Sequence, residues 1–257
     1  MRIILSPAKK MNEDRDTLEP LGLPVYVKQT EQVLSWMRTQ SREDLHKLWK
    51  CNDKITTLNI ERVEHMDLYS KLTPAILSYE GIAFRYMAPA VFDTGQFTYV
   101  QEHLRILSAF YGVLKPMDGV TPYRLEMQAK ALVGGSKDLY DFWGSRLYDE
   151  VRDESGIILN LASKEYAKCI EKYLTDKDTY ITVTFCEKSG EKFVTKGTYA
   201  KMARGEMVRY MAEMQIEKPE DIRKFNRLGY VFRADMSSDT EYVFERVGVK
   251  EFVADKY

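Results

Sequence analysis

The chain has few of the residues that build metal centres and disulfide frameworks. Its 257 residues include only three cysteines and three histidines. Cys51, Cys169 and Cys186 lie far apart without a Cys-x-x-Cys pair, and no two histidines share a His-x-x-x-His spacing. These spacings exclude the common zinc-binding patterns. We therefore expect no metal site and three reduced thiols, as suits a cytoplasmic protein.

Signals for membranes and for common cofactors are missing as well. No apolar run approaches the ~20 residues that span a bilayer, and residues 3–5 are too short for the core of a signal peptide. The chain has no P-loop, no Gly-x-Gly-x-x-Gly motif and no Gly-x-Ser-x-Gly motif. We expect a cytoplasmic location, no membrane partner and no bound cofactor.

The chain also lacks an excess of charge of either sign. Its 38 lysines and arginines are balanced by 39 aspartates and glutamates, which leaves a net charge of -1. This balance excludes a surface that is basic all over. A nucleic-acid site would have to be a local positive cleft, with acidic surface elsewhere.

Hydrophobic patterning predicts a mixed α/β (α+β) fold. Residues 2–5 and 157–161 are short apolar runs typical of buried strands, and residues 179–185 alternate like a half-buried strand. A turn at Ser189-Gly190 joins this last strand to residues 191–195 in a predicted hairpin. Helical patterns dominate the first 150 residues. Because no repeat or linker interrupts the chain, we expect a single domain over residues 1–257, with a helix-rich N-terminal half and a mixed sheet.

Two predicted strands are followed by similar polar segments. Ser6 and Lys9 follow the first strand. Asn160 lies at the end of the strand at residues 157–161, and Ser163 follows it. In α/β proteins, ligands gather beyond the carboxyl ends of strands, where the N-terminus of a following helix attracts anions. These residues could therefore hold a phosphate group. Alternatively, Ser163 is a plain helix cap and Ser6 belongs to a turn.

A predicted helix at residues 201–215 carries the densest group of cations. Lys201, Arg204 and Arg209 fall within an arc of about 140° on this helix, with Lys196 just before it. Such a face can lie along a phosphate backbone. It can equally be the solvated face of an amphipathic helix.

The segment of residues 104–127 has the most distinctive pattern. Apolar residues at steps of three and four predict a helix that ends at Gly112, a glycine that tolerates positive φ. Arg105, Lys115 and Arg124 interrupt this apolar segment. They are either candidates for an anion-binding surface or ordinary solvated charges.

Several motifs give the chain a close resemblance to the YaaA family of bacterial proteins, which are linked to peroxide-stress resistance. They are LRILSAFYGVLKPMD (104–118) with TPYRLEM (121–127), ILSPAK (4–9), NDK (52–54), KDLYDFWG (137–144), NLASKEY (160–166), ARG (203–205), FNRLGY (225–230) and VFER (243–246). These motifs cover the chain nearly from end to end and occur in the same order as in the family.

The resemblance implies a protein that binds double-stranded DNA without strong sequence preference and limits iron-driven oxidative damage. It also implies a positive cleft with a helix-hairpin-helix element, which we place at residues 104–114. The DNA contacts expected on this reading are Arg105, Lys115, Lys201, Arg204 and Arg209. This chain has Ala109 where the family usually has glycine and Lys115 where it usually has arginine. Alanine resists positive φ, so the hairpin is expected to differ.

An alternative function is an enzyme that acts on a phosphorylated or nucleotide-like small molecule. Its candidate catalytic residues are Ser6, Lys9, Arg124, Asn160, Ser163 and Tyr166, which we expect to converge in one pocket. Glu126 is a candidate general base, although an ion pair with Arg124 is the commoner arrangement. The shape of the basic surface separates the two functions, because a duplex needs an open groove and a metabolite a closed pocket.

Overall fold

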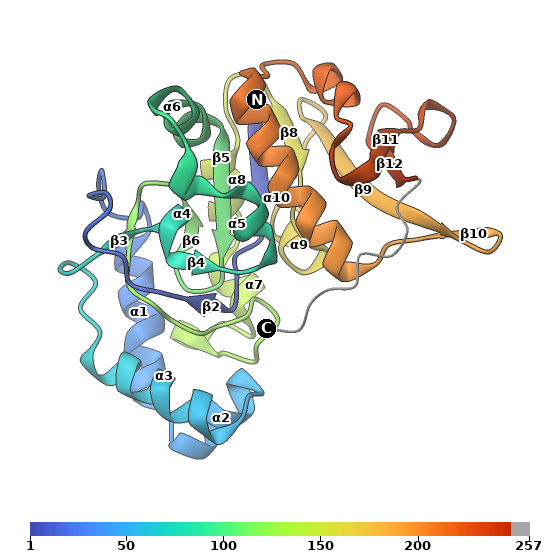
Figure 1. Cartoon of the computed structure of the whole chain (residues 1–257). Helices are drawn as coiled ribbons and strands as arrows, with labels where there is room; N and C mark the ends of the chain where they lie inside the picture. Colours follow the sequence, from blue (N-terminus) through green and yellow to red (C-terminus); the bar gives the residue numbers. More distant parts are fainter. Residues whose placement is uncertain (248–257) are drawn as a thin grey trace.

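A mixed sheet of mostly parallel strands runs through the computed structural model, which describes residues 1–247 (Figure 1). The strand order is β11-β12-β9-β8-β1-β5-β6, and β10 pairs with β9. The strands are β1 (Arg2–Leu5), β5 (Leu104–Ser108), β6 (Gly112–Leu114), β8 (Ile157–Asn160), β9 (Thr179–Ser189), β10 (Lys192–Val194), β11 (Tyr230–Phe232) and β12 (Glu241–Arg246). Two short ladders, β2 (Lys10–Met11) with β4 (Tyr79–Glu80) and β3 (Thr73–Pro74) with β7 (Gly119–Val120), lie outside this sheet.

Helices surround the sheet. They are α1 (Val27–Arg38), α2 (Arg42–Trp49), α3 (Asp53–His65), α4 (Ala75–Ser78), α5 (Ile82–Met87), α6 (Thr94–His103), α7 (Leu139–Trp143), α8 (Arg146–Val151), α9 (Lys164–Glu171) and α10 (Gly197–Met214). Short 3-10 turns are η1 (Pro89–Val91), η2 (Val133–Gly135), η3 (Pro219–Lys224), η4 (Arg227–Gly229) and η5 (Ala234–Met236). Helix α10 contacts β9, α5 and α6, and it crosses in front of the sheet in Figure 1.

The predicted strands around the centre of the sheet are confirmed. The strand at residues 157–161 ends one residue early, at Asn160, and the hairpin turns at Ser189 and Gly190 as expected. Strand β1 is parallel to both of its neighbours, β8 and β5. The buried hydrophobic side chains of both halves of the chain form one cluster around this sheet, so the fold is a mixed α/β domain.

The prediction of a helix-hairpin-helix element at residues 104–114 is wrong. Helix α6 begins at a capping box between Asp93 and Gln96 and ends at His103. The next residues form β5 and β6, an antiparallel strand pair. Every residue of β5 is buried, and a continuous apolar run shorter than a typical helix does not reveal its structure through periodicity. Gly112 takes the positive φ of +79°, and Ala109 does not.

No helix within residues 1–247 is both long enough and apolar enough to cross a membrane. The three cysteines, all in this part of the chain, have free thiols.

Candidate functional site

A pocket of about 480 Å³ lies beyond the carboxyl ends of β1 and β8. Four chain segments and one helix face surround it. Its lining is Leu5 to Lys10, Glu80 to Phe84, Tyr123 to Glu126, Leu161, Ser163, Glu165, Tyr166, Lys201 and Arg204. The pocket therefore combines the two polar strand ends and part of the basic helix face that the sequence singled out.

The sheet topology explains why a pocket forms at this place. The chain passes from β1 to β5 on one side and later returns to β8 on the other side of β1. Loops that leave adjacent parallel strands in opposite directions open a crevice at their carboxyl ends, where α/β proteins bind ligands. The loop after β1 and the turn into α9 form two walls of this crevice.

Ser6 and Ser163 join these two walls directly. The Ser163 backbone N–H donates to Ser6 Oγ at 2.8 Å, and Ser6 Oγ lies 3.1 Å from Ser163 Oγ. Ser163 occupies the N-cap position of α9, but its side chain accepts no capping hydrogen bond. The plain helix-cap interpretation therefore does not account for its hydroxyl, which lines the pocket instead.

Asn160 supports the pocket without lining it. Its Oδ1 accepts the Ala162 N–H at 2.9 Å, and its Nδ2 lies 3.4 Å from Thr182 Oγ1. Only 4% of Asn160 is exposed. The side chain thus fixes the turn between β8 and α9, while Lys9, Arg124, Ser163, Ser6 and Tyr166 reach the pocket itself.

The charges in the pocket do not balance. Five basic side chains (Lys9, Lys10, Arg124, Lys201 and Arg204) and three acidic ones (Glu80, Glu126 and Glu165) line it, for a formal charge of +2. Lys9 Nζ lies 2.8 Å from Glu126 Oε1, and Lys10 Nζ lies 2.8 Å from Glu80 Oε2. These pairs neutralise lysines at the rim and leave the arginines poorly compensated.

Arg124 and Arg204 are the poorly compensated pair. Only 14% of the Arg124 side chain is exposed, and its nearest carboxylate, Glu126, lies 3.8 Å away. Arg204 makes no hydrogen bond or ion pair within residues 1–247, and burial lowers the pKa of its guanidinium below the usual value. The Nε atoms of both arginines are buried without a hydrogen-bond partner in that part of the chain. Such groups are costly unless something anionic meets them.

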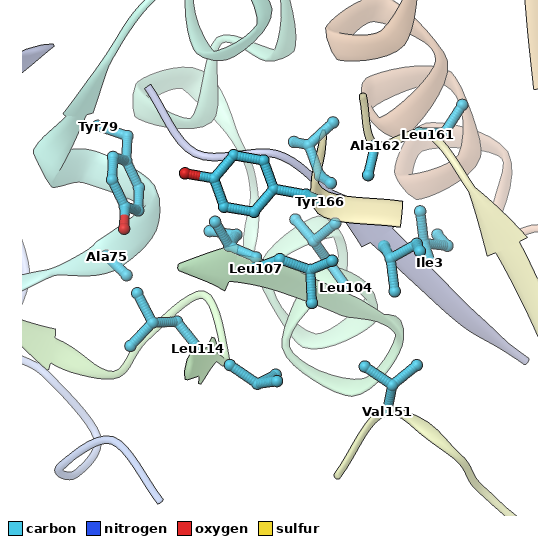
Figure 2. Close-up of a cluster of buried hydrophobic side chains, with 14 of the residues drawn as sticks. Ile3, Ala75, Tyr79, Leu104, Leu107, Leu114, Val151, Leu161, Ala162 and Tyr166 are labelled. Carbon is cyan, nitrogen blue, oxygen red and sulfur yellow. The ribbon is translucent and has the colours of Figure 1, made fainter. Parts of the chain in front are cut away.

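Buried hydroxyl groups lie behind the pocket. Ser108 Oγ accepts the N–H groups of Phe110 and Tyr111, so its own hydrogen is free to reach Tyr123 Oη at 2.7 Å. Tyr123 Oη lies 2.9 Å from Tyr79 Oη. Figure 2 shows Tyr166 among the buried side chains of β1 and β5, its hydroxyl directed to the side on which Tyr79 lies. Burial raises the pKa of Tyr166 well above its usual value, so the phenol stays protonated.

Three residues expected to contact DNA lie elsewhere. Arg105 is only 3% exposed, and its guanidinium donates to the carbonyls of Gln101, Glu102 and Leu104. Burial lowers its pKa to about 10. The expectation that Arg105 forms part of a binding surface is wrong, because position 105 belongs to a buried strand and its side chain satisfies the end of α6.

Lys115 and Arg209 also lie outside the pocket lining. Lys115 is partly buried in the turn after β6, where its backbone N–H donates to Asp118. The Nε of Arg209 lies 2.7 Å from Glu213 Oε1, one helical turn further along α10. The helix thus divides its cations, with Lys201 and Arg204 at the pocket and Arg209 in an intramolecular ion pair.

Sequence reasoning missed the wall formed by residues 80–84 and the way it is held. A Cβ atom added to Gly205 would lie 1.9 Å from the Ala83 carbonyl oxygen. This glycine lets α10 approach α5 closely, which brings Arg204 and Lys201 to the pocket. An isolated glycine inside a helical pattern was the available signal for such a close contact.

No group of three or more histidine, cysteine, aspartate or glutamate side chains within residues 1–247 is arranged to hold a metal ion. The candidate site is therefore described by its cations and hydroxyl groups.

Comparisons with known proteins give a consistent relationship. The family model described as peroxide stress protein YaaA matches residues 1–236. A UPF0246 protein of Agathobacter rectalis is 68% identical over 96% of this chain and 99% of its own length. UPF0246 proteins of Desulfitobacterium hafniense and Limosilactobacillus reuteri are 50% and 48% identical, over 95% and 96% of this chain and 97% and 100% of their own lengths. The chain belongs to the peroxide stress protein YaaA family.

Proposed function

We propose that the pocket binds a phosphorylated small molecule, as an enzyme acting on such a molecule requires. The observation that carries the proposal is the pair of arginines, Arg124 and Arg204. Their Nε atoms are buried without a hydrogen-bond partner among residues 1–247, in a pocket of net positive charge. Guanidinium groups bind phosphate through two parallel hydrogen bonds. A phosphate between them would supply the acceptors that the described residues do not.

The remaining lining supports the same ligand. The hydroxyl groups of Ser6 and Ser163 lie at the first turn of α9, where unpaired backbone N–H groups and the helix dipole favour an anion. Lys9 adds a flexible ammonium at the rim. The volume of about 480 Å³ is that of a small-molecule site, which favours a small molecule over a duplex in this pocket.

Glu126 competes with the proposed ligand, because its carboxylate lies 2.8 Å from Lys9 and 3.8 Å from Arg124. Glu126→Gln should therefore raise the affinity for inorganic phosphate by about three- to tenfold or more, since removing one charge about 4 Å away is worth about 1 kcal/mol even at the dielectric constant of water. Isothermal titration calorimetry measures this change. Glu191→Gln, the same charge change on the exposed β9–β10 turn, should leave the affinity unaltered. Equal or weaker binding by the Glu126 variant would argue against the anion site.

Non-specific binding of double-stranded DNA is a second candidate, favoured by the exposed lysines at the rim of the pocket. Lys9, Lys10 and Lys201 are exposed there. Lys9 and Lys10 would have to exchange Glu126 and Glu80 for phosphates, whereas Lys201 has no ion pair within the described residues. On this proposal the chain coats DNA in the cytoplasm and limits iron-driven oxidative damage to it. The peroxide-stress description of the family agrees with this role.

The DNA candidate predicts a weak, strongly salt-dependent affinity. With about three phosphates neutralised, log K should fall against log salt with a slope of roughly -3. Lys201→Ala should flatten this slope by about 1, whereas Lys192→Ala, an exposed lysine on β10, should leave it unchanged. Fluorescence anisotropy with two unrelated duplexes measures both effects. Equal slopes for the parent and the two variants would remove DNA from consideration.

A further inference from the structure

We infer that the ligand is a phosphate monoester that carries an aromatic ring (here called an aromatic monoester), as nucleoside monophosphates do, rather than a phosphodiester or a free anion. This inference rests on the proposed function and specifies the ligand of the same pocket. Three properties of the pocket lead to it: its charge, its apolar wall and its neutral hydrogen-bonding groups.

The formal charge of the lining matches a terminal phosphate. The five basic and three acidic side chains leave a charge of +2. A phosphate monoester carries about -1.5 to -2 charges at pH 7. A phosphodiester carries a single charge, which would leave one of the two poorly compensated arginines without a counter-charge. The pairing of Arg124 with Arg204 is thus better suited to a monoester.

Part of the pocket lining is apolar and aromatic. Phe84, Tyr123 and Tyr166 line the pocket and are themselves buried. Leu5, Leu125 and Leu161, also buried, complete this lining. Inorganic phosphate would cover none of this surface, whereas a planar ring would pack against it. Small-molecule pockets commonly combine such an apolar wall with a few polar groups that orient the ligand.

The third property is a neutral hydrogen-bond donor, the Tyr166 hydroxyl. Within residues 1–247 the Tyr166 hydroxyl has no hydrogen-bond partner, although only 6% of the residue is exposed. The phenol stays protonated at neutral pH because burial raises its pKa. It can donate to an uncharged acceptor such as a ring nitrogen or a carbonyl oxygen. Ser6 and Ser163, which also line the pocket, can bind sugar or phosphate oxygens.

The size of the pocket also favours a monoester over a diester. A volume of about 480 Å³ lies within the range of small-molecule sites, about 300–1,000 Å³. A nucleotide inside a nucleic-acid strand has further nucleotides attached on both sides, and these would have to be accommodated outside the pocket. A terminal monoester brings its whole phosphate into the pocket and leaves no chain to accommodate.

Calorimetric titration of the full chain with matched probes tests the inference. The probes are inorganic phosphate, phenyl phosphate, each common nucleoside 5′-monophosphate, the corresponding nucleosides, and a dinucleoside phosphate without a terminal phosphate. At least one aromatic monoester should bind about tenfold or more tightly than inorganic phosphate, its own nucleoside and the diester, because ring burial and the second charge each add to affinity.

Two variants assign the two halves of the ligand. Tyr166→Phe keeps the ring and removes the unused hydroxyl, so it should weaken binding of a nucleoside monophosphate about three- to tenfold, the range for one hydrogen bond, and leave inorganic phosphate unaffected. Phe84→Leu should weaken binding of phenyl phosphate and of the nucleoside monophosphates more than binding of inorganic phosphate. Thermal melting of each variant establishes that it is folded.

The outcomes separate this inference from the proposed function. If inorganic phosphate binds as tightly as every monoester, or if the diester binds as tightly, the inference is wrong and the phosphate pocket stands. If no phosphate-containing probe binds, both proposals are wrong. A nucleoside that binds as tightly as its monophosphate would also contradict both, because the arginines would then contribute nothing.

Discussion

Gly205→Ala is expected to lower the melting temperature by about 3–10 °C. The added methyl group would lie 1.9 Å from the Ala83 carbonyl oxygen, far inside van der Waals contact, so α10 and α5 would have to separate. Overpacking of this kind costs about 1–3 kcal/mol, and each kcal/mol shifts the melting temperature of a chain of this size by about 2–4 °C. Because α5 and Arg204 both line the pocket, phosphate affinity should fall as well.

Gly197→Ala is the matched control on the same helix. A Cβ atom at this position meets nothing within 4 Å, and Gly197 is the first residue of α10. Alanine favours a helix over glycine by up to about 1 kcal/mol, so the melting temperature should stay constant or rise slightly. Differential scanning calorimetry of both variants compares them. Equal melting temperatures would show that α10 does not depend on the close approach at Gly205.

Arg204→Met is expected to stabilise the chain and to weaken phosphate binding. Methionine keeps an unbranched side chain that extends to about the position of Nε, and it removes a guanidinium that has no partner within the described residues. Burying such a polar group costs about 1–3 kcal/mol, so the free energy of unfolding should rise by a similar amount. Hydrogen bonds to charged groups contribute about 1.5–3 kcal/mol each, so the loss of affinity for inorganic phosphate should be at least about tenfold.

Arg209→Met provides the comparison, because Arg209 lies on the same helix and forms an ion pair with Glu213. Replacing Arg209 removes a surface ion pair worth about 0.3–0.5 kcal/mol, and Glu213 keeps its second partner, Arg227. Stability should therefore fall slightly and phosphate affinity should stay the same. If Arg204→Met destabilised the chain as Arg209→Met does, Arg204 would be a structural residue and the anion site would lose its main support.

The two polar strand ends could be located from the sequence because strong local signals surround them. Apolar runs in front of Ser6 and Ser163 indicate buried strands, and the polar residues that begin at Ser6 and at Asn160 mark where these strands end. The rule that sites gather beyond the carboxyl ends of parallel strands then places these segments together. The structure brings Ser6 and Ser163 into direct contact.

Arg105 shows where local patterns fail. Helical and strand arrangements both fit the apolar residues around it, and only the pairing of β5 with β1 and β6 selects the strand. That choice turns a predicted surface cation into a buried one. The sequence shows which residues of this segment are apolar. Whether the segment is a strand that is buried on both faces depends on its pairing with strands far away in the sequence.

The wall at residues 80–84 could not be predicted for a different reason. Its position depends on Gly81, where an added Cβ would lie 2.7 Å from Ala8 Cβ, and on the contact of Ala83 with Gly205. Both contacts join segments far apart in the chain. A single glycine in the sequence indicates that another segment can pack closely against it, but it does not indicate which segment. This side of the pocket is therefore visible only in the tertiary structure.

The most direct test of the anion site is the dependence of the melting temperature on inorganic phosphate in the parent chain and in Arg204→Met. A ligand that binds only the folded state raises stability by RT ln(1 + [L]/Kd), and phosphate also stabilises proteins generally by its exclusion from their surface. The parent should therefore start lower and rise more steeply with phosphate than Arg204→Met, while Arg209→Met follows the parent. Parallel curves for the parent and Arg204→Met would contradict the account.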